Sequence, residues 1–213
     1  MTVTVVAIDG PAGSGKSTLA RALAERIGLP YVNTGSMYRA LTSAALRSGI
    51  SIEDPGGLVG LMPRLRFHVD TSRGELVIEG PFDPDSLEQP EVEAAVSVAS
   101  SHPEVRALMR KEQRRLGERG AVMEGRDIGS EVFPDAPVKV FLKAEPSTRG
   151  SRRAKDRAEA HRDVADALRA RDSKDSVVNP FEPQPGAMII DTTNTGAEET
   201  LRLVLEAVRK RLA

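Results

Sequence analysis

The chain has 213 residues, of which 39% are hydrophobic, and its 30 Lys and Arg against 31 Asp and Glu give a net charge of −1. These values describe one ordinary globular domain with no general attraction to nucleic acid or anionic lipid. The absence of cysteine excludes disulfides and thiolate metal sites. No apolar run approaches the length of a membrane span, and the first residues lack a signal-peptide pattern. We therefore expect a cytoplasmic protein that binds neither nucleic acid nor a membrane.

The expected elements begin with an apolar strand at residues 3–9, followed by Gly-Pro-Ala-Gly-Ser-Gly-Lys-Ser at 10–17. This run matches the phosphate-binding loop pattern G-x-x-x-x-G-K-S/T, and the helix required after it is predicted up to Ile27, with Gly28 ending it. Glycines let several backbone N–H groups point at one anion, and the helix N-terminus adds partial positive charge. Lys16 can neutralise the outer phosphates, while the Ser17 hydroxyl can hold a Mg²⁺ ion that bridges them. The sequence therefore predicts a nucleoside triphosphate site.

Further strands are expected at 29–33, 120–124, 138–142 and 187–193, alternating with helices that begin near Thr34, Val92, Pro103, Pro146 and Glu198. Five strands alternating with helices favour an α/β fold with a five-stranded parallel sheet and short right-handed crossovers.

Other segments differ from this alternation. Residues 65–69 and 75–79, separated by Asp70–Gly74, predict a β-hairpin inserted on the parallel core. Asp54-Pro55-Gly56-Gly57 is expected to be a turn, and the three prolines in 81–90 indicate a linker. Ser101-His102-Pro103-Glu104 predicts a capping box.

Arginine recurs where strands end: in Thr34–Arg39, in Arg126-Asp127 and in the basic segment after Ala144. Ligands of open α/β sheets bind at the carboxyl ends of the strands. Guanidinium groups bind phosphate bidentately and offset the charge of a transferring phosphoryl group. This pattern predicts an acceptor that carries a phosphate, such as a nucleoside monophosphate. Most charges in 149–175 are expected to be solvated, and no function is assigned to the three histidines.

The motifs resemble those of bacterial cytidylate kinases over essentially the full length. The runs that carry the resemblance are Ile8–Thr18, Thr34–Arg39, Gly125–Gly129 with Val132–Ala136, and Arg171–Ser176. The resemblance implies a P-loop nucleoside monophosphate kinase fold in a single domain, 1–213. A monophosphate-binding insert would occupy about 57–95, and a short helical lid about 145–160.

The resemblance also implies the reaction of ATP with CMP or dCMP to give ADP and CDP or dCDP, by a monomer that uses Mg²⁺ bound with ATP. Catalysis would involve Lys16, Arg126, Asp127 and Arg153. The ATP site would comprise Gly10, Pro11, Ala12, Gly13, Ser14, Gly15, Lys16, Ser17, Thr18, Arg149 and Arg152, with Ser17 on the metal. Arg39 and Arg126 would bind the CMP phosphate. The base would contact Thr34, Arg106 and Asp127, and the sugar would contact Ser97, Arg171 and Asp175.

One of these implied roles agrees with simple chemistry. A carboxylate such as Asp127 can accept a hydrogen bond from the 4-amino group of cytosine, whereas uracil presents an oxygen there. UMP should therefore be rejected. Asp9 and Asp127 are weaker candidates for ordering water around Mg²⁺. Val178 stands where many relatives carry an arginine, which puts the affinity for CMP in question.

Three other classes of protein stay open. A P-loop kinase acting on UMP or on a non-nucleotide alcohol is the nearest, and a pyrimidine panel separates it. A GTPase-type switch would need an Asn-Lys-x-Asp motif, yet none of Asn33, Asn179 and Asn194 is followed by lysine. A nucleotide-binding interaction module is disfavoured because Lys16 and Ser17 are both intact.

Overall fold

Residues 4–157 and 182–212 are described by the computed structural model. The strands are β1 (Val5–Asp9), β2 (Tyr31–Asn33), β3 (Arg66–Asp70), β4 (Glu75–Glu79), β5 (Ala121–Gly125), β6 (Val138–Lys143) and β7 (Met188–Asp191). The helices are α1 (Lys16–Ile27), α2 (Thr34–Arg47), α3 (Pro55–Leu61), α4 (Pro90–Ala99), α5 (Pro103–Gly117), α6 (Pro146–Arg157) and α8 (Ala197–Leu212). Short helical turns span Met62–Arg64, Pro84–Ser86 and Ile128–Val132.

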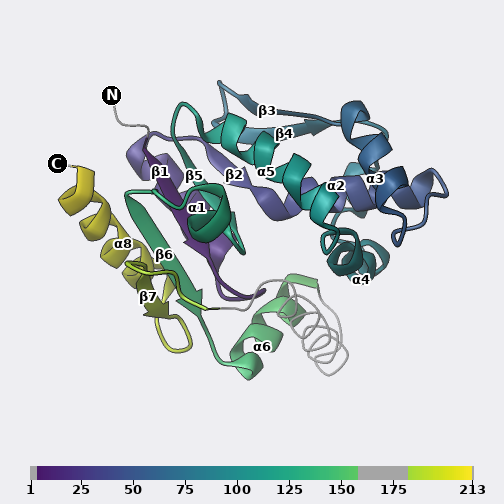
Figure 1. Cartoon of the computed structure of the whole chain (residues 1–213). Coiled ribbons are helices and arrows are strands. Elements are labelled where there is room, and N and C mark those ends of the chain that lie inside the picture. Colours follow the sequence, from purple (N-terminus) through teal and green to yellow (C-terminus); the bar gives the residue numbers. More distant parts are fainter. Residues whose placement is uncertain (1–3, 158–181, 213) are drawn as a thin grey trace.

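One twisted sheet organises these elements, in the strand order β3-β4-β2-β5-β1-β6-β7 (Figure 1). The central strand β1 pairs in parallel with β5 and β6, and β2 pairs in parallel with β5. Their registers bring Asp9 opposite Gly125 and Asn33 opposite Glu124. The carboxyl ends of β1, β2 and β5 therefore meet at one edge, where the loop after each strand can contribute to one site.

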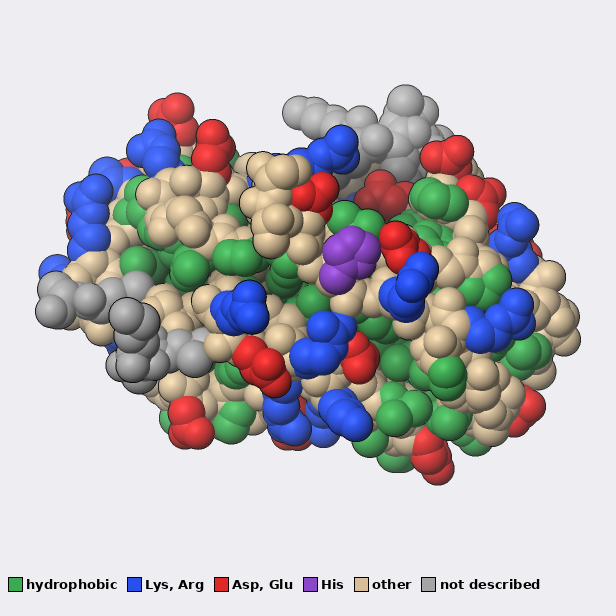
Figure 2. All heavy atoms as spheres, turned by 90° about the horizontal axis from the view of Figure 1, so that it is seen from above, with side chains coloured by type: hydrophobic (Ala, Val, Ile, Leu, Met, Phe, Trp, Pro, Cys, Tyr) green, Lys and Arg blue, Asp and Glu red, His purple; other side chains and the backbone are tan. Residues whose placement is uncertain are grey.

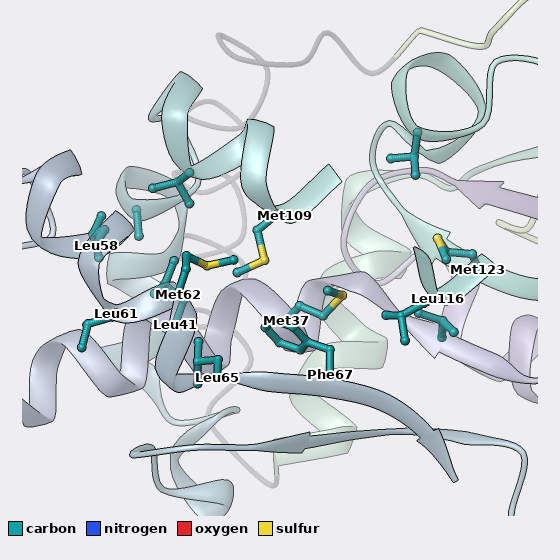
Figure 3. Packing of buried hydrophobic residues seen from close by; sticks show 14 of the residues in the cluster. Met37, Leu41, Leu58, Leu61, Met62, Leu65, Phe67, Met109, Leu116 and Met123 are labelled. Atoms are coloured by element: carbon teal, nitrogen blue, oxygen red, sulfur yellow. The ribbon is translucent and has the colours of Figure 1, made fainter. Parts of the chain in front are cut away.

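Helices cover both faces of the sheet, so the central strands are buried throughout. On one face, α1 and α8 pack with Val6, Ile8 and Val140 in a cluster of buried side chains. On the other, α2, α3 and α5 enclose a second cluster, part of which Figure 3 shows. Its labelled members are Met37, Leu41, Leu58, Leu61, Met62, Leu65, Phe67, Met109, Leu116 and Met123.

The hairpin β3–β4 belongs to the main sheet. β3 and β4 are antiparallel, as predicted, but β4 also pairs in parallel with β2 through Tyr31 and Glu75. The N–H of Tyr31 donates to the carbonyl oxygen of Gly74 at 2.7 Å. The five predicted parallel strands and the predicted hairpin are both present, and because the hairpin pairs with β2, the sheet of the described residues has seven strands. The hairpin pattern in the sequence is local, so it does not predict with which other strand the hairpin pairs.

Two local expectations were wrong. Asp54–Gly57 is the start of α3, with Asp54 at the N-cap and Pro55 in the first turn, a position that suits proline. A Cβ at Gly57 would lie 2.7 Å from the Ile50 side chain, so close packing explains one of the glycines that resembled a turn.

The predicted capping box does not form either. His102 is the N-cap of α5 and has no side-chain cap. The Ser101 hydroxyl donates instead to the carbonyl oxygen of Val98 at 2.7 Å, which satisfies the end of the preceding helix.

The helix predicted from Pro146 to Asp175 begins as expected with α6, which lies beyond the carboxyl ends of β1 and β6 (Figure 1). Residues 158–175 of this prediction lie outside the described residues. The face seen in Figure 2 carries acidic and basic side chains interspersed among apolar ones. None of the described helices combines the length and the apolar character that a membrane crossing requires.

Candidate active site

The loop between β1 and α1 has the backbone conformation that its glycines allow. Gly10, Gly13 and Gly15 have φ angles of 146°, 74° and 92°. At Gly10 a Cβ would lie 2.2 Å from the carbonyl oxygen of Leu142, so no other residue fits without displacing β6. Gly15 is the N-cap of α1 without a side-chain cap, and the first turn of the helix has no acidic residue. The first N–H groups of the helix therefore have no side-chain cap, an arrangement that suits anion binding.

Lys16 and Ser17 face a cavity at the carboxyl edge of the sheet. The ammonium group of Lys16 donates to the carbonyl oxygen of Pro11 at 2.8 Å, across the loop. The Ser14 hydroxyl is buried, and no described residue bonds to it. A buried polar atom of this kind beside a helix N-terminus fits a loop shaped around phosphate oxygens.

Sequence reasoning missed Glu124, which binds Ser17. The hydroxyl of Ser17 donates to Oε2 of Glu124 at 3.0 Å, and the Tyr31 hydroxyl donates to Oε1. Burial, and then the negative charge of Glu124, raise the pKa of the Tyr31 hydroxyl above its usual 10.0. Glu124 is buried. The signal in the sequence was a carboxylate inside the otherwise apolar run 120–124, since a buried charge is costly unless it is paired.

These oxygens suit a hard cation. The Ser17 hydroxyl and the Glu124 carboxylate are ligand types that Mg²⁺ prefers, and Mg²⁺ usually keeps several waters and substrate phosphates in its shell. Within the described residues no group of three or more His, Cys, Asp or Glu could hold a metal alone. The donor set therefore fits a metal that arrives with a nucleotide rather than one held by the protein alone.

Arginines from α2 and from the segment after β5 line the same cavity. Arg39, on α2, donates to the Ser36 hydroxyl at 3.0 Å, and Arg126, directly after β5, donates to the carbonyl oxygen of Gly10 at 3.0 Å. Arg126 therefore links the segment after β5 to the start of the phosphate-binding loop.

Asp127 has several partners around it. Its Oδ2 accepts from Arg106 at 2.5 Å and from Arg110 at 3.3 Å, both on α5. The predicted Asp127 and Arg106 therefore lie together, whereas Arg110 was not predicted. The Thr34 hydroxyl, at the start of α2, donates to the carbonyl oxygen of Glu124 at 2.7 Å. The predicted residues that line the cavity are Ala12, Gly13, Lys16, Ser17, Thr34, Arg39, Ser97, Arg106, Arg126, Asp127 and Arg153.

Asp9 was considered as a residue that orders water around Mg²⁺, but it lies elsewhere. Its two carboxylate oxygens accept the N–H groups of Ile128 and Gly129 at 2.9 and 2.8 Å. Burial raises the pKa of Asp9 to about 6, while these N–H groups act in the opposite direction. Asp9 is not among the cavity-lining residues. It fixes the loop that follows Asp127, so the suggestion that Asp9 orders water around Mg²⁺ has no support in this geometry.

Arg149, Arg152 and Arg153 of α6 bind three different partners. Arg149 is buried and donates to the carbonyl oxygens of Ala144 and Ala12, at 3.1 Å each, so it braces the phosphate-binding loop. Arg152 donates to Oγ1 and the carbonyl oxygen of Thr192, at 3.1 and 2.5 Å. Arg153 forms an ion pair with Glu93 of α4.

Arg152 and Thr192 line a second cavity with Ser14, Gly15 and Thr18, on the side of the loop next to α8. The predicted Gly10 and Pro11 are in the loop itself. The predicted Arg171 and Asp175, with Val178, lie outside the described residues.

A strand, glycine loop and helix at the edge of a parallel sheet, with Lys16, Ser17 and converging arginines, define a P-loop kinase of small molecules. Solved structures agree on the fold. A gluconokinase from Sinorhizobium meliloti superimposes with a TM-score of 0.51 at 16% identity, covering 98% of this chain and 93% of that one. A shikimate kinase from Bacteroides thetaiotaomicron gives 0.50 at 13% identity, covering 97% and 98%.

Sequence comparisons give the family. The family model Cytidylate kinase matches residues 6–210. A cytidylate kinase of Mycobacterium leprae is 40% identical, over 99% of this chain and 98% of its own length. One of Bacillus subtilis is 37% identical, over 97% and 96%. The chain belongs to the cytidylate kinase family, and it is accordingly an ATP-dependent kinase of CMP and dCMP.

Proposed function

We propose that the cavity beside the phosphate-binding loop is where the γ-phosphoryl group of ATP passes to CMP or dCMP, with the residue roles given below. The observation that supports this most is that one cavity is lined by Lys16 and Ser17 on one side and by Arg39, Arg126 and Asp127 on another. Phosphoryl transfer depends mainly on alignment and charge neutralisation, and this arrangement supplies both.

The phosphate groups are the part of the substrates that the basic residues bind. The N–H groups of the loop and the N-terminus of α1 hold the triphosphate, with Lys16 turning from Pro11 to its outer phosphates. Arg39 and Arg126 bind the phosphate of CMP. Arg126 and Arg153 offset the charge on the transferring group, and Arg149 keeps the loop in shape through Ala12.

A divalent metal fits between the nucleotide and the protein at Ser17, with the buried Glu124 beside it. Bound Mg²⁺ supplies positive charge to the β- and γ-phosphate oxygens. The residues of the chain do the rest: Glu124 orients the Ser17 hydroxyl, and Tyr31 holds the Glu124 carboxylate.

The base of CMP is recognised by Asp127, Arg106 and Thr34, and the sugar by Ser97, with Arg171 and Asp175. Asp127 and Thr34 are both buried and line the cavity, which suits recognition away from water. An ionised Asp127 can only accept hydrogen bonds, so it pairs with the 4-amino group of cytosine and not with the oxygen of uracil. We also propose that the enzyme is monomeric and works in the cytoplasm, a location that a chain without cysteine suits.

The test compares Asp127→Asn with the parent protein, using MgATP and each of CMP, dCMP and UMP. The parent should use CMP and dCMP and hardly any UMP. Asp127→Asn should lose about ten- to a hundredfold in kcat/KM for CMP, the equivalent of one specific base contact of ~1–3 kcal/mol. Its ratio of kcat/KM for UMP over CMP should be higher than that of the parent. Asp135→Asn, an exposed residue in the same segment, is the control and should keep the parent's selectivity. Unchanged preference for CMP over UMP in Asp127→Asn would refute the role of Asp127.

A further inference from the structure

Two arginines of α5 hold one oxygen of Asp127. Arg106 and Arg110 are one helical turn apart, so they project from the same face of the helix. Both bind Oδ2 of Asp127, at 2.5 and 3.3 Å. Among the described residues none bonds to Oδ1. The carboxylate is therefore fixed at one oxygen, which leaves the other oxygen for a ligand.

The two arginines differ in where they lie. Arg106 lines the cavity with Asp127, whereas Arg110 is not among the lining residues. Arg110 uses its other terminal nitrogen, Nη1, for an ion pair with Oε2 of Glu131 at 2.9 Å. The N–H of Glu131 in turn donates to the carbonyl oxygen of Asp127 at 2.9 Å. Arg110 thus lies behind Asp127 and is itself anchored by the loop that carries Asp127.

This arrangement carries a cost in stability. The side chain of Asp127 is 9% exposed and that of Arg110 is 25% exposed, so both charges are largely removed from water. The Nε of Arg110 is buried, and no described residue bonds to it. A buried donor without a partner opposes folding, which argues that the arginine is placed for another purpose than stability.

We propose that Arg110 is a positioning residue for base recognition, which sets the Asp127 carboxylate so that Oδ1 meets the 4-amino group of cytosine. This proposal rests on the base-reading role of Asp127 proposed above. Arg110 does not touch the substrate. Without it, Asp127 keeps one arginine on Oδ2 and can rotate, so the acceptor oxygen is no longer fixed.

The first test is Arg110→Met, with steady-state kinetics for CMP and UMP and thermal unfolding. The KM for CMP should rise about tenfold, and the ratio of kcat/KM for CMP over UMP should fall by a similar factor, as the loss of one oriented contact predicts. The KM for ATP, and kcat at saturating CMP, should change less than twofold. A residue with a structural role alone would alter the melting temperature without altering the preference between two acceptors that differ only in the base.

Arg114→Met is the matched control. Arg114 lies one turn further along α5 and also reaches this loop, but it donates to the carbonyl oxygens of Val132 and Glu131 and not to Asp127. It should keep the parent's selectivity. Arg110→Lys should recover part of the selectivity, because an ammonium group can reach one carboxylate but cannot bridge two. If Arg110→Met does not fold, Glu131→Gln replaces it. Glu131 is an exposed residue, and its variant should show a smaller loss in the same direction.

Asp127→Asn separates this proposal from the one on which it rests. If Asp127→Asn loses selectivity and Arg110→Met keeps the parent's ratio, Arg110 is not a positioning residue while the role of Asp127 stands. If Asp127→Asn itself keeps the ratio, both proposals fail. If both proposals are correct, the double variant Asp127→Asn/Arg110→Met should have the same ratio of kcat/KM for CMP over UMP as Asp127→Asn alone. The reason is that Arg110 acts on this ratio only through Asp127.

Discussion

Buried carboxylates in apolar strands are the residues on which the site depends. Asp9 and Glu124 both end or nearly end a strand whose other residues are hydrophobic, and both are buried. Each is satisfied in a different way: Asp9 by two backbone N–H groups, and Glu124 by the hydroxyls of Ser17 and Tyr31. A buried carboxylate is expensive, so its partners show what it does. Asp9 holds a loop, and Glu124 lines the cavity beside Lys16 and Ser17.

Asp9 gives the stability of the protein a distinctive pH dependence. Its pKa is about 6 in the folded protein against 3.8 ordinarily, mainly because of burial. Between these two values the folded protein keeps the proton that the unfolded chain has lost, so the contribution of Asp9 to the free energy of unfolding falls as the pH rises. At 1.36 kcal/mol per pH unit, the fall is about 3 kcal/mol between pH 4 and pH 6, with no further fall above.

The measurement is urea unfolding of the parent and of Asp9→Asn at several pH values. Relative to Asp9→Asn, the parent should lose up to about 3 kcal/mol between pH 4 and 6. Asp70→Asn is the opposite case, since hydrogen bonds from Ser72 lower the pKa of Asp70. Relative to Asp70→Asn, the parent should gain stability as the pH rises through the usual pKa of Asp. A difference between parent and Asp9→Asn that does not vary with pH would show that Asp9 titrates normally.

Among the elements, α2 follows its strand with no loop between them. α2 begins at Thr34 directly after β2, and the Asn33 side chain caps it by accepting the N–H of Ser36 at 3.1 Å. Because the connection is so short, Thr34 and Arg39 lie at the carboxyl edge of the sheet. Helix residues such as Lys16, Thr34 and Arg106 therefore line the cavity together with the short segments that follow β1 and β5.

Two helix glycines should respond in opposite directions to alanine. A Cβ at Gly60 in α3 would have no atom within 4 Å of it, so Gly60→Ala should stabilise by about 0.5–1 kcal/mol through the lower entropy of the unfolded chain. At Gly117, the last residue of α5, a Cβ would lie 2.4 Å from the ring of Phe133. Gly117→Ala should therefore destabilise by about 1–3 kcal/mol through overpacking.

Chemical denaturation of both variants checks this. Adding Phe133→Leu to Gly117→Ala should restore part of the loss, because the smaller side chain gives the new methyl group room. If Gly60→Ala and Gly117→Ala changed the free energy of unfolding by the same amount, helix propensity alone would determine the effect at both positions.

At the scale of the whole molecule, the sheet separates two clusters of buried side chains. Leu58 of α3 belongs to one cluster and Val204 of α8 to the other, and both are fully buried. Each cluster fills one face of the same strands, so the two faces fold together even though their side chains do not touch across the sheet. The cavity lies where the carboxyl ends of these strands leave the core.

This separation predicts additive mutations. Leu58→Ala should cost about 2–5 kcal/mol, and Val204→Ala about 2 kcal/mol, from the apolar groups removed. The double variant should cost the sum to within about 0.5 kcal/mol, because the sites share no partners. Urea unfolding followed by circular dichroism measures all three. A deviation above about 1 kcal/mol would show that the clusters are coupled through the sheet.

The features that depend on neighbouring residues could be predicted from the sequence. The strand, glycine loop and helix around Lys16 and Ser17, the parallel alternation, and the placement of Arg126 and Asp127 after a buried strand were all predicted. Each of these features is encoded by consecutive residues, for which local periodicity and backbone preference determine the structure. The resemblance added the acceptor and the family, and the comparisons confirmed both.

Contacts between residues far apart in the sequence could not be predicted, because they depend on how the elements pack. Ser17 and Glu124 are 107 positions apart, and their contact depends on the register of β1 against β5. Arg110 reaches Asp127 from α5, and Arg149, Arg152 and Arg153 bind the phosphate-binding loop, Thr192 and Glu93, which lie far apart in the sequence and meet only around α6. The hairpin joins β2 through one edge that its own sequence does not specify. Strand register and helix packing arise from the burial of the whole core, and no local run of residues encodes them.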